Sequence, residues 1–132
     1  MNDALVDTDV VSFLFKGHSS AYLYLPDLKD RKLGISFMTL AELDRWALQA
    51  RWGEARLQRF RQYLEGYILV PYSRDLCKKW AEVTLAAEAA GRRIECADAW
   101  VAATALHHGL PLITHNRTDF LGVPGLTLIS HG

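Results

Sequence analysis

Short apolar runs alternate along the whole chain with longer segments whose apolar residues recur at helical spacing. The apolar runs, each of which predicts a buried strand, are residues 4–6, 32–37, 67–70, 110–114 and 126–129. The segments with helical spacing are residues 10–15, 39–51, 54–65, 74–90 and 97–106. Strands and helices that alternate in this way form a parallel sheet with helices on both faces. The pattern therefore predicts a three-layer α/β/α domain with a mostly parallel central sheet of about five strands.

Polar residues that can cap helices mark where the first helices should begin. Asp7 or Asp9 could cap the first helix, because a side-chain oxygen there accepts a hydrogen bond from a free backbone N–H. Ser19 or Ser20 could cap a short second helix, which Pro26 should disturb.

Length and composition limit the class of protein. The 132 residues, half of them hydrophobic, suffice for one globular domain over residues 1–132. Fifteen basic and fifteen acidic residues cancel, and this absence of net charge favours association with a partner. No signal segment opens the chain and no apolar run reaches membrane-spanning length, so we expect a cytoplasmic protein that does not enter a membrane. Cys77 and Cys96 lack metal-site spacing and are expected to be buried free thiols.

Arginines are concentrated between residues 45 and 61, where five of them lie with the single acid Glu54. The candidates for RNA binding in this stretch are Arg51, Arg56, Arg59 and Arg61. Such a group could contact phosphates, or it could be an ordinary solvated helix face. The sequence leaves both interpretations open.

Asp98 is the single charge in the segment over residues 97–106, which is nearly all alanine, valine, leucine and tryptophan. In a helix it shares one face with Val101, Ala102 and Ala105. A carboxylate on an apolar face is costly unless it is paired, hydrogen-bonded or bound to a metal. The ordinary alternative is an acid that complements the helix dipole and caps free N–H groups.

Four acids should meet at the carboxyl edge of the sheet, where ligands of open parallel sheets gather. They are Asp7 at the end of the first strand, Glu42 and Asp98 in the first turns of two helices, and Asp119 after the fourth strand. Each has an ordinary explanation: Asp7 as an N-cap, Glu42 as part of a capping box with Thr39, Asp98 as a dipole partner and Asp119 as a solvated loop acid. Their joint placement at one edge favours a functional site.

Crowded carboxylates raise one another's pKa unless a cation compensates their charge. Oxygen ligands on flexible arms suit Mg²⁺ or Mn²⁺ better than zinc. A divalent ion held in this way can activate water and stabilise a phosphoryl oxygen during displacement. No serine, cysteine or histidine shows a comparable arrangement of nucleophile and base.

Four motifs, in order, make the chain resemble a PIN domain of the VapC toxin branch. They are Leu5-Val6-Asp7-Thr8-Asp9, Ile35-Ser36 with Thr39-x-x-Glu42-Leu43, Asp98-Ala99-x-x-Ala102-x-x-Ala105, and Leu112-Ile113-Thr114-x-Asn116-x-x-Asp119-Phe120. The resemblance covers essentially the whole chain, and Pro124-Gly125-Leu126 matches the family's usual ending.

The resemblance implies a PIN-like fold and a Mg²⁺-dependent endoribonuclease that is the toxin of a toxin–antitoxin pair. By position, the acidic quartet is Asp7, Glu42, Asp98 and Asp119, and the polar supports are Thr114 and Asn116. Asp7 and Asp98 would be the main metal ligands, and Glu42 would bind or orient the attacking water. Asp119, the most variable of the four acids in the family, would assist a metal.

The resemblance also implies two protein partners, a second copy of the chain and an antitoxin whose tail occupies the acidic pocket. A homodimer is favoured as well by the zero net charge and by tryptophans at positions 46, 52, 80 and 100, which exceed what one core of this size needs.

Two other classes of protein compete with this interpretation. Asp7-Thr8-Asp9-Val10-Val11 fits the nucleophile motif of haloacid-dehalogenase phosphatases, and Ile113-Thr114 resembles their second motif. Only a short tail without lysine or paired acids follows Thr114, however, so that site would be incomplete. The remaining alternative is a catalytically silent PIN-like module that only binds RNA or a partner, and the intact acids argue against it.

Overall fold

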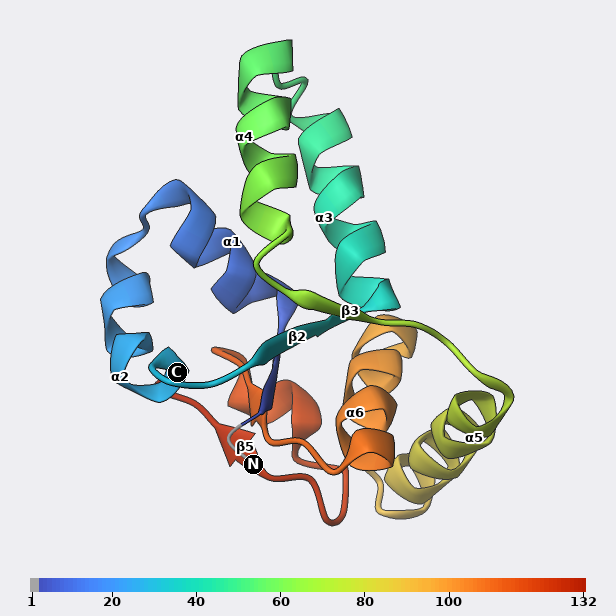
Figure 1. Ribbon diagram of the computed structural model, residues 1–132. Helices are drawn as coiled ribbons and strands as arrows, with labels where there is room; N and C mark the ends of the chain where they lie inside the picture. Colours follow the sequence, from blue (N-terminus) through green and yellow to red (C-terminus); the bar gives the residue numbers. More distant parts are fainter. Residues whose placement is uncertain (1–2) are drawn as a thin grey trace.

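The central sheet consists of parallel strands in the spatial order β3-β2-β1-β4-β5. In the computed structural model, which describes residues 3–132, they are β1 (Ala4–Val6), β2 (Leu33–Ser36), β3 (Ile68–Val70), β4 (Leu112–Ile113) and β5 (Leu128–Ile129). The predicted five-stranded parallel sheet is confirmed, with the buried strand β1 in its middle. Since the strands run in one direction, their carboxyl ends share the edge from which α1 and α3 start (Figure 1).

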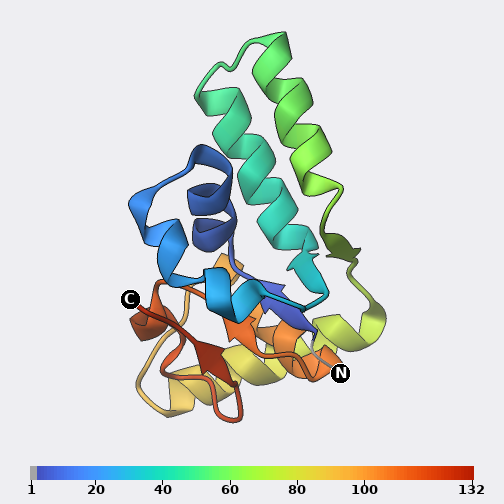
Figure 2. The same ribbon diagram turned by 60° about the vertical axis from the view of Figure 1, so that its left-hand side comes forward.

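Helices cover both faces of the sheet (Figures 1 and 2). They are α1 (Thr8–Lys16), α2 (Leu25–Leu28), α3 (Phe37–Gln49), α4 (Glu54–Leu64), α5 (Arg74–Ala89), α6 (Cys96–His108) and the 3-10 helices η1 (Ser19–Leu23) and η2 (Arg117–Phe120). Successive residues of β1 point to opposite faces. Val6 packs with Val10 and Leu43 beneath α1 and α3, whereas Leu5 packs with Leu76 beneath α5 and α6. The predicted three-layer α/β/α arrangement is therefore confirmed.

Two of the predicted helix caps are wrong. Ser36, and not Thr39, caps α3, because Ser36 Oγ accepts the Thr39 N–H at 3.0 Å. Glu42 consequently lies in the second turn and not in a capping box, so its carboxylate is available to other partners. At η1 the cap is His18, whose Nδ1 accepts the Ser20 N–H at 3.0 Å.

The helices α3 and α4 form an antiparallel hairpin that extends beyond the carboxyl edge of the sheet (Figures 1 and 2). Inside it Trp46 and Trp52 pack edge to face with ring centroids 4.7 Å apart, and both contact Phe60. Elsewhere Trp80 stacks on Trp100 at 5.3 Å. All four tryptophans therefore have aromatic partners within the chain, so they do not by themselves require a second copy.

Cys77 and Cys96 are both free thiols, as expected, but the expected burial is wrong: Cys77 is only partly buried, and Cys96, which opens α6 at the surface, is exposed. Among residues 3–132, none of the helices is long and apolar enough to span a membrane.

Candidate active site

Asp7 serves both the fold and the candidate site. It follows β1 directly and caps α1, with Oδ1 accepting the Thr8 N–H at 2.9 Å. Its other oxygen, Oδ2, accepts a hydrogen bond from Thr114 Oγ1 at 2.8 Å, and only 7% of the residue is exposed. Burial, together with the neighbouring charge of Asp9, raises the pKa of Asp7 to about 7 in spite of these hydrogen bonds. The N-cap interpretation is thus correct, and it does not exclude a functional one.

Glu42 is held by a threonine that the sequence interpretation did not single out. Thr8 Oγ1 donates to Glu42 Oε1 at 2.7 Å and lies 3.0 Å from Oγ1 of the buried Thr39. The two threonines therefore fix the carboxylate of α3 against the start of α1. The one indication of this role in the sequence is that Thr8 is a polar residue directly after Asp7, at the end of the first strand.

Asp98 lies half-buried in the first turn of α6, as predicted. Within the described part of the chain its carboxylate accepts no hydrogen bond and forms no ion pair, so it caps nothing. Burial raises its pKa to about 6, and the charges of Asp119, Glu42, Glu95 and Asp9 contribute in that order. These charges show that the acids from α1, α3, η2 and α6 face one common region. The explanation of Asp98 as a capping residue therefore fails.

The segment after β4 supplies the remaining predicted residues. Thr114 is buried and bonds to Asp7, while the Asn116 side chain donates from Nδ2 to Asp9 Oδ2 at 3.0 Å. The Asn116 N–H also bonds to Thr114 Oγ1, at 3.1 Å. Asp119 lies exposed in η2, from where its charge acts on Asp98. Both predicted supports thus touch acids, but Asn116 touches one outside the predicted quartet.

Asp9 is the residue that the predicted quartet missed. It is half-buried, burial raises its pKa, and its charge contributes to the raised pKa values of both Asp7 and Asp98. The signal was present in the sequence, since Asp7 and Asp9 flank one residue at the end of β1.

The chemistry of this group fits a hard divalent cation. The donors are carboxylate oxygens, and burial raises the pKa of Asp7, Asp9 and Asp98, to which the charges of neighbouring acids add for Asp7 and Asp98. Across residues 3–132 the ion pairs are Arg61–Glu54 and His131–Asp27, both away from these acids. No three His, Cys, Asp or Glu side chains in the same range stand close enough to form a ready-made ligand set. An ion would therefore have to draw the carboxylates together.

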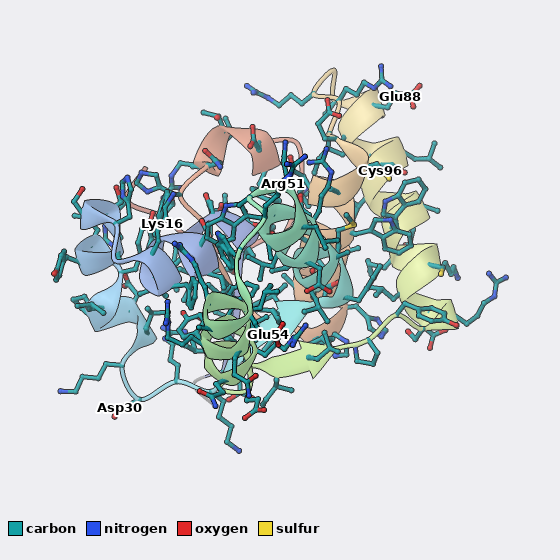
Figure 3. The ribbon with its side chains drawn as sticks, turned by 90° about the horizontal axis from the view of Figure 1, so that it is seen from above. Lys16, Asp30, Arg51, Glu54, Glu88 and Cys96 are labelled. Atoms are coloured by element: carbon teal, nitrogen blue, oxygen red, sulfur yellow. The ribbon has the colours of Figure 1, made fainter. Side chains whose placement is uncertain are left out.

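The candidate arginines lie on or beside the α3–α4 hairpin, which Figure 3 views from above with Arg51 and Glu54 labelled. Arg56 stacks over Trp52 with 4.3 Å between guanidinium and ring, and Arg61 lies 3.9 Å from Glu54 at the surface. Arg51 and Arg59 are both exposed. The hairpin is thus basic, but two of its four candidates already contact neighbouring side chains.

Comparison with known proteins gives consistent matches over most of the chain. The model of the family described as "PIN domain" matches residues 4–126. Ribonuclease VapC4 of Mycobacterium tuberculosis is 32% identical over 99 residues, which cover 74% of this chain and 75% of that protein. VapC ribonuclease Y4jK of Sinorhizobium fredii is 30% identical over 135 residues, covering 96% and 95%.

Solved structures agree with this result. The VapBC2 complex of Rickettsia felis, bound to a DNA fragment from its promoter, has a chain that superposes with a TM-score of 0.86 at 21% identity, covering 98% of this chain and 99% of that one. A toxin–antitoxin complex from Klebsiella pneumoniae gives a TM-score of 0.77 at 28% identity, covering 96% and 95%.

Proposed function

This chain belongs to the PIN-domain family, and from that premise we propose that it is the endoribonuclease toxin of a toxin–antitoxin pair, acting with Mg²⁺ or Mn²⁺. The observation that carries the proposal is Asp98, a half-buried carboxylate beside other acids for which the described residues provide no cation and no hydrogen bond. Such an arrangement is costly for the fold and is explained by metal binding.

Each acid has a defined role in this proposal. Asp7 and Asp98 would be the main ligands, and Asp119 would assist from η2. When bound by these residues, the ion would supply a Lewis acid that lowers the pKa of water and neutralises charge on the phosphate. Glu42, fixed by Thr8, would orient the attacking water and accept its proton. Thr114 holds one oxygen of Asp7 in place, so the ligand is oriented before substrate arrives.

The test is to incubate the purified protein with total RNA, with Mg²⁺ and with a chelator. We expect cleavage only when the ion is present, and restoration of cleavage when Mn²⁺ replaces Mg²⁺. RNA that is bound but never cut under any of these conditions would instead support the catalytically silent binding module.

We propose that RNA crosses the basic α3–α4 hairpin on its way to the acids. Arg51→Gln combined with Arg59→Gln should weaken RNA binding and reduce the salt slope of log K by about one to two, because each lost phosphate contact removes roughly 0.7–0.9. Binding is measured without metal, so that RNA stays intact. The matched control is Lys29→Gln with Lys32→Gln, two cations next to the start of β2 at the opposite end of the sheet. Equal slopes in both double variants would show that the arginines only solvate the hairpin.

The antitoxin, as proposed here, inhibits by placing a basic side chain among the acids. An arginine can form two hydrogen bonds to a carboxylate and would then compete with the metal for it. Inhibition by a cognate antitoxin peptide should therefore weaken as the Mg²⁺ concentration rises. Inhibition constants measured at low and high Mg²⁺ decide the point, since equal constants mean that the peptide blocks RNA outside the acidic region.

We also propose a homodimer. The support is the free edge of the sheet, because β3 is its outermost strand and leaves Ile68 and Leu69 about half exposed, next to the exposed Tyr72. An unpaired apolar edge of this kind favours association. Light scattering gives the mass in solution, and a monomer at micromolar concentration would contradict the proposal.

A further inference from the structure

Asp9 receives three N–H groups from two separate parts of the chain. The Val10 N–H donates to Oδ1 at 2.7 Å. The His115 N–H and Asn116 Nδ2 both donate to Oδ2 at 3.0 Å. The latter two donors belong to the segment after β4, so Asp9 connects the first turn of α1 to a segment 106 residues away.

Only a carboxylate satisfies all three donors at once. An ionised aspartate has acceptors on both oxygens, whereas an asparagine presents one acceptor and one NH₂ group. Whichever way an amide at position 9 is turned, its NH₂ meets either the Val10 N–H or the donors of His115 and Asn116. This demand explains why the position carries aspartate, although a further negative charge beside Asp7 and Asp98 is unfavourable.

The same segment is held from its other side by Tyr24, which is fully buried. The Tyr24 hydroxyl lies 2.6 Å from His115 Nδ1 and 3.2 Å from the Thr114 carbonyl oxygen. Residues 114–116 are therefore fixed between Asp9 and Tyr24. Asp119 follows within one turn, where the Asp119 N–H donates to the Asn116 carbonyl oxygen at 3.1 Å.

We propose that Asp9 is a positioning residue, which holds residues 114–116 through its oxygens and thereby sets where Asp119 stands relative to Asp98. It acts through the segment after β4, because three N–H groups already occupy most of the roughly four acceptor sites of its carboxylate. This inference rests on the proposed ribonuclease function.

Asp9→Ala tests the proposal because it removes both acceptor oxygens, whereas an amide could still turn its oxygen toward the His115 N–H. Loss of such an outer partner typically costs about tenfold to a hundredfold in activity. We expect that loss in kcat for RNA cleavage, with KM little changed. In an Asp119→Asn background the same substitution should lower kcat by no more than about threefold, because coupled residues are not additive. An equal loss in both backgrounds would overturn the proposal and make Asp9 an independent ligand.

A second measurement needs no activity. Amide hydrogen exchange, recorded without metal, should show at least tenfold faster exchange of the His115 N–H in Asp9→Ala, which removes both acceptor oxygens, while the Leu5 N–H in the central strand stays protected. Asn116→Ala, which removes one donor at the surface, should accelerate the same amide to a smaller extent. The control is Asp75→Asn, an exposed acid on α5, away from the proposed RNA path, that should change neither kcat nor exchange.

Unchanged exchange of the His115 N–H in Asp9→Ala would overturn the proposal. A wild-type protein that cuts no RNA would refute the proposed function, and the exchange measurement would still decide whether Asp9 holds the segment.

Discussion

Asp98→Asn should lower RNA cleavage by about a hundredfold to a thousandfold or more while leaving the fold intact. The Asp98 side chain accepts no hydrogen bond within the described chain, so the isosteric amide leaves no protein donor without its partner. The substitution also removes a charge that neighbouring acids oppose, as the raised pKa of about 6 shows. The metal-free protein should therefore be as stable as the wild type at neutral pH, or more stable.

The matched control is Asp75→Asn, because Asp75 also lies in the first turn of a long helix, α5, but on the exposed surface. Loss of a favourable interaction with the helix dipole is common to both variants. Comparing the cleavage rates and melting temperatures of Asp98→Asn and Asp75→Asn then separates a catalytic role of Asp98 from its effect on the helix dipole. An Asp98→Asn protein that unfolds, while its folded remainder cuts RNA at the normal rate, would mean that this acid serves the structure alone.

The strand and helix pattern predicted the fold because period and length are local properties of the sequence. Asp7 was placed correctly for the same reason: it ends an apolar run, and an acid there can cap the next helix. The capping box at Thr39 failed, although its spacing was right. Ser36 lies three residues earlier and takes the cap, and a choice between two adequate caps depends on where β2 ends.

Contacts between distant segments were outside the reach of these local patterns. Thr8 meets Glu42 across 34 positions, and Asp9 meets Asn116 across 107. Neither pairing leaves a periodic pattern in a single sequence. The sequence therefore does not predict that Thr8 binds Glu42 or that Asp9 binds Asn116, although both residues directly follow Asp7 in the chain. In the same way, the count of arginines did not reveal that Arg56 stacks on Trp52.

The second large effect concerns stability. In the metal-free protein, the free energy of unfolding should fall as the pH rises from about 4 to 7, and Asp7→Asn should remove much of this fall. The folded protein keeps the Asp7 proton up to a pKa of about 7, whereas the unfolded chain loses it near 3.8, the ordinary pKa of an aspartate. Between these values the folded state binds more protons than the unfolded state, so raising the pH favours unfolding.

The size of the effect follows from the same difference. Each unit of difference between the folded and unfolded pKa of Asp7 corresponds to about 1.4 kcal/mol of stability. Relaxation of the folded protein relieves part of the cost of burying the ionised carboxylate. We therefore expect Asp7→Asn to be more stable than wild type by about 2 kcal/mol at pH 7 and by almost nothing at pH 4. The amide can keep both contacts of Asp7, because its oxygen accepts the Thr8 N–H and its NH₂ can donate to Thr114 Oγ1.

Urea unfolding of both proteins at pH 4, 5, 6 and 7, in the presence of a chelator, measures this difference directly. Asp44→Asn, at an exposed position, corrects for the general effect of removing one negative charge. Adding Mg²⁺ at pH 7 should stabilise the wild type more than Asp7→Asn, because an ion that binds only the folded state adds to its stability. A stability difference between wild type and Asp7→Asn that is the same at every pH would mean that the pKa of Asp7 is the same in the folded and the unfolded protein, and that burial does not hold its proton.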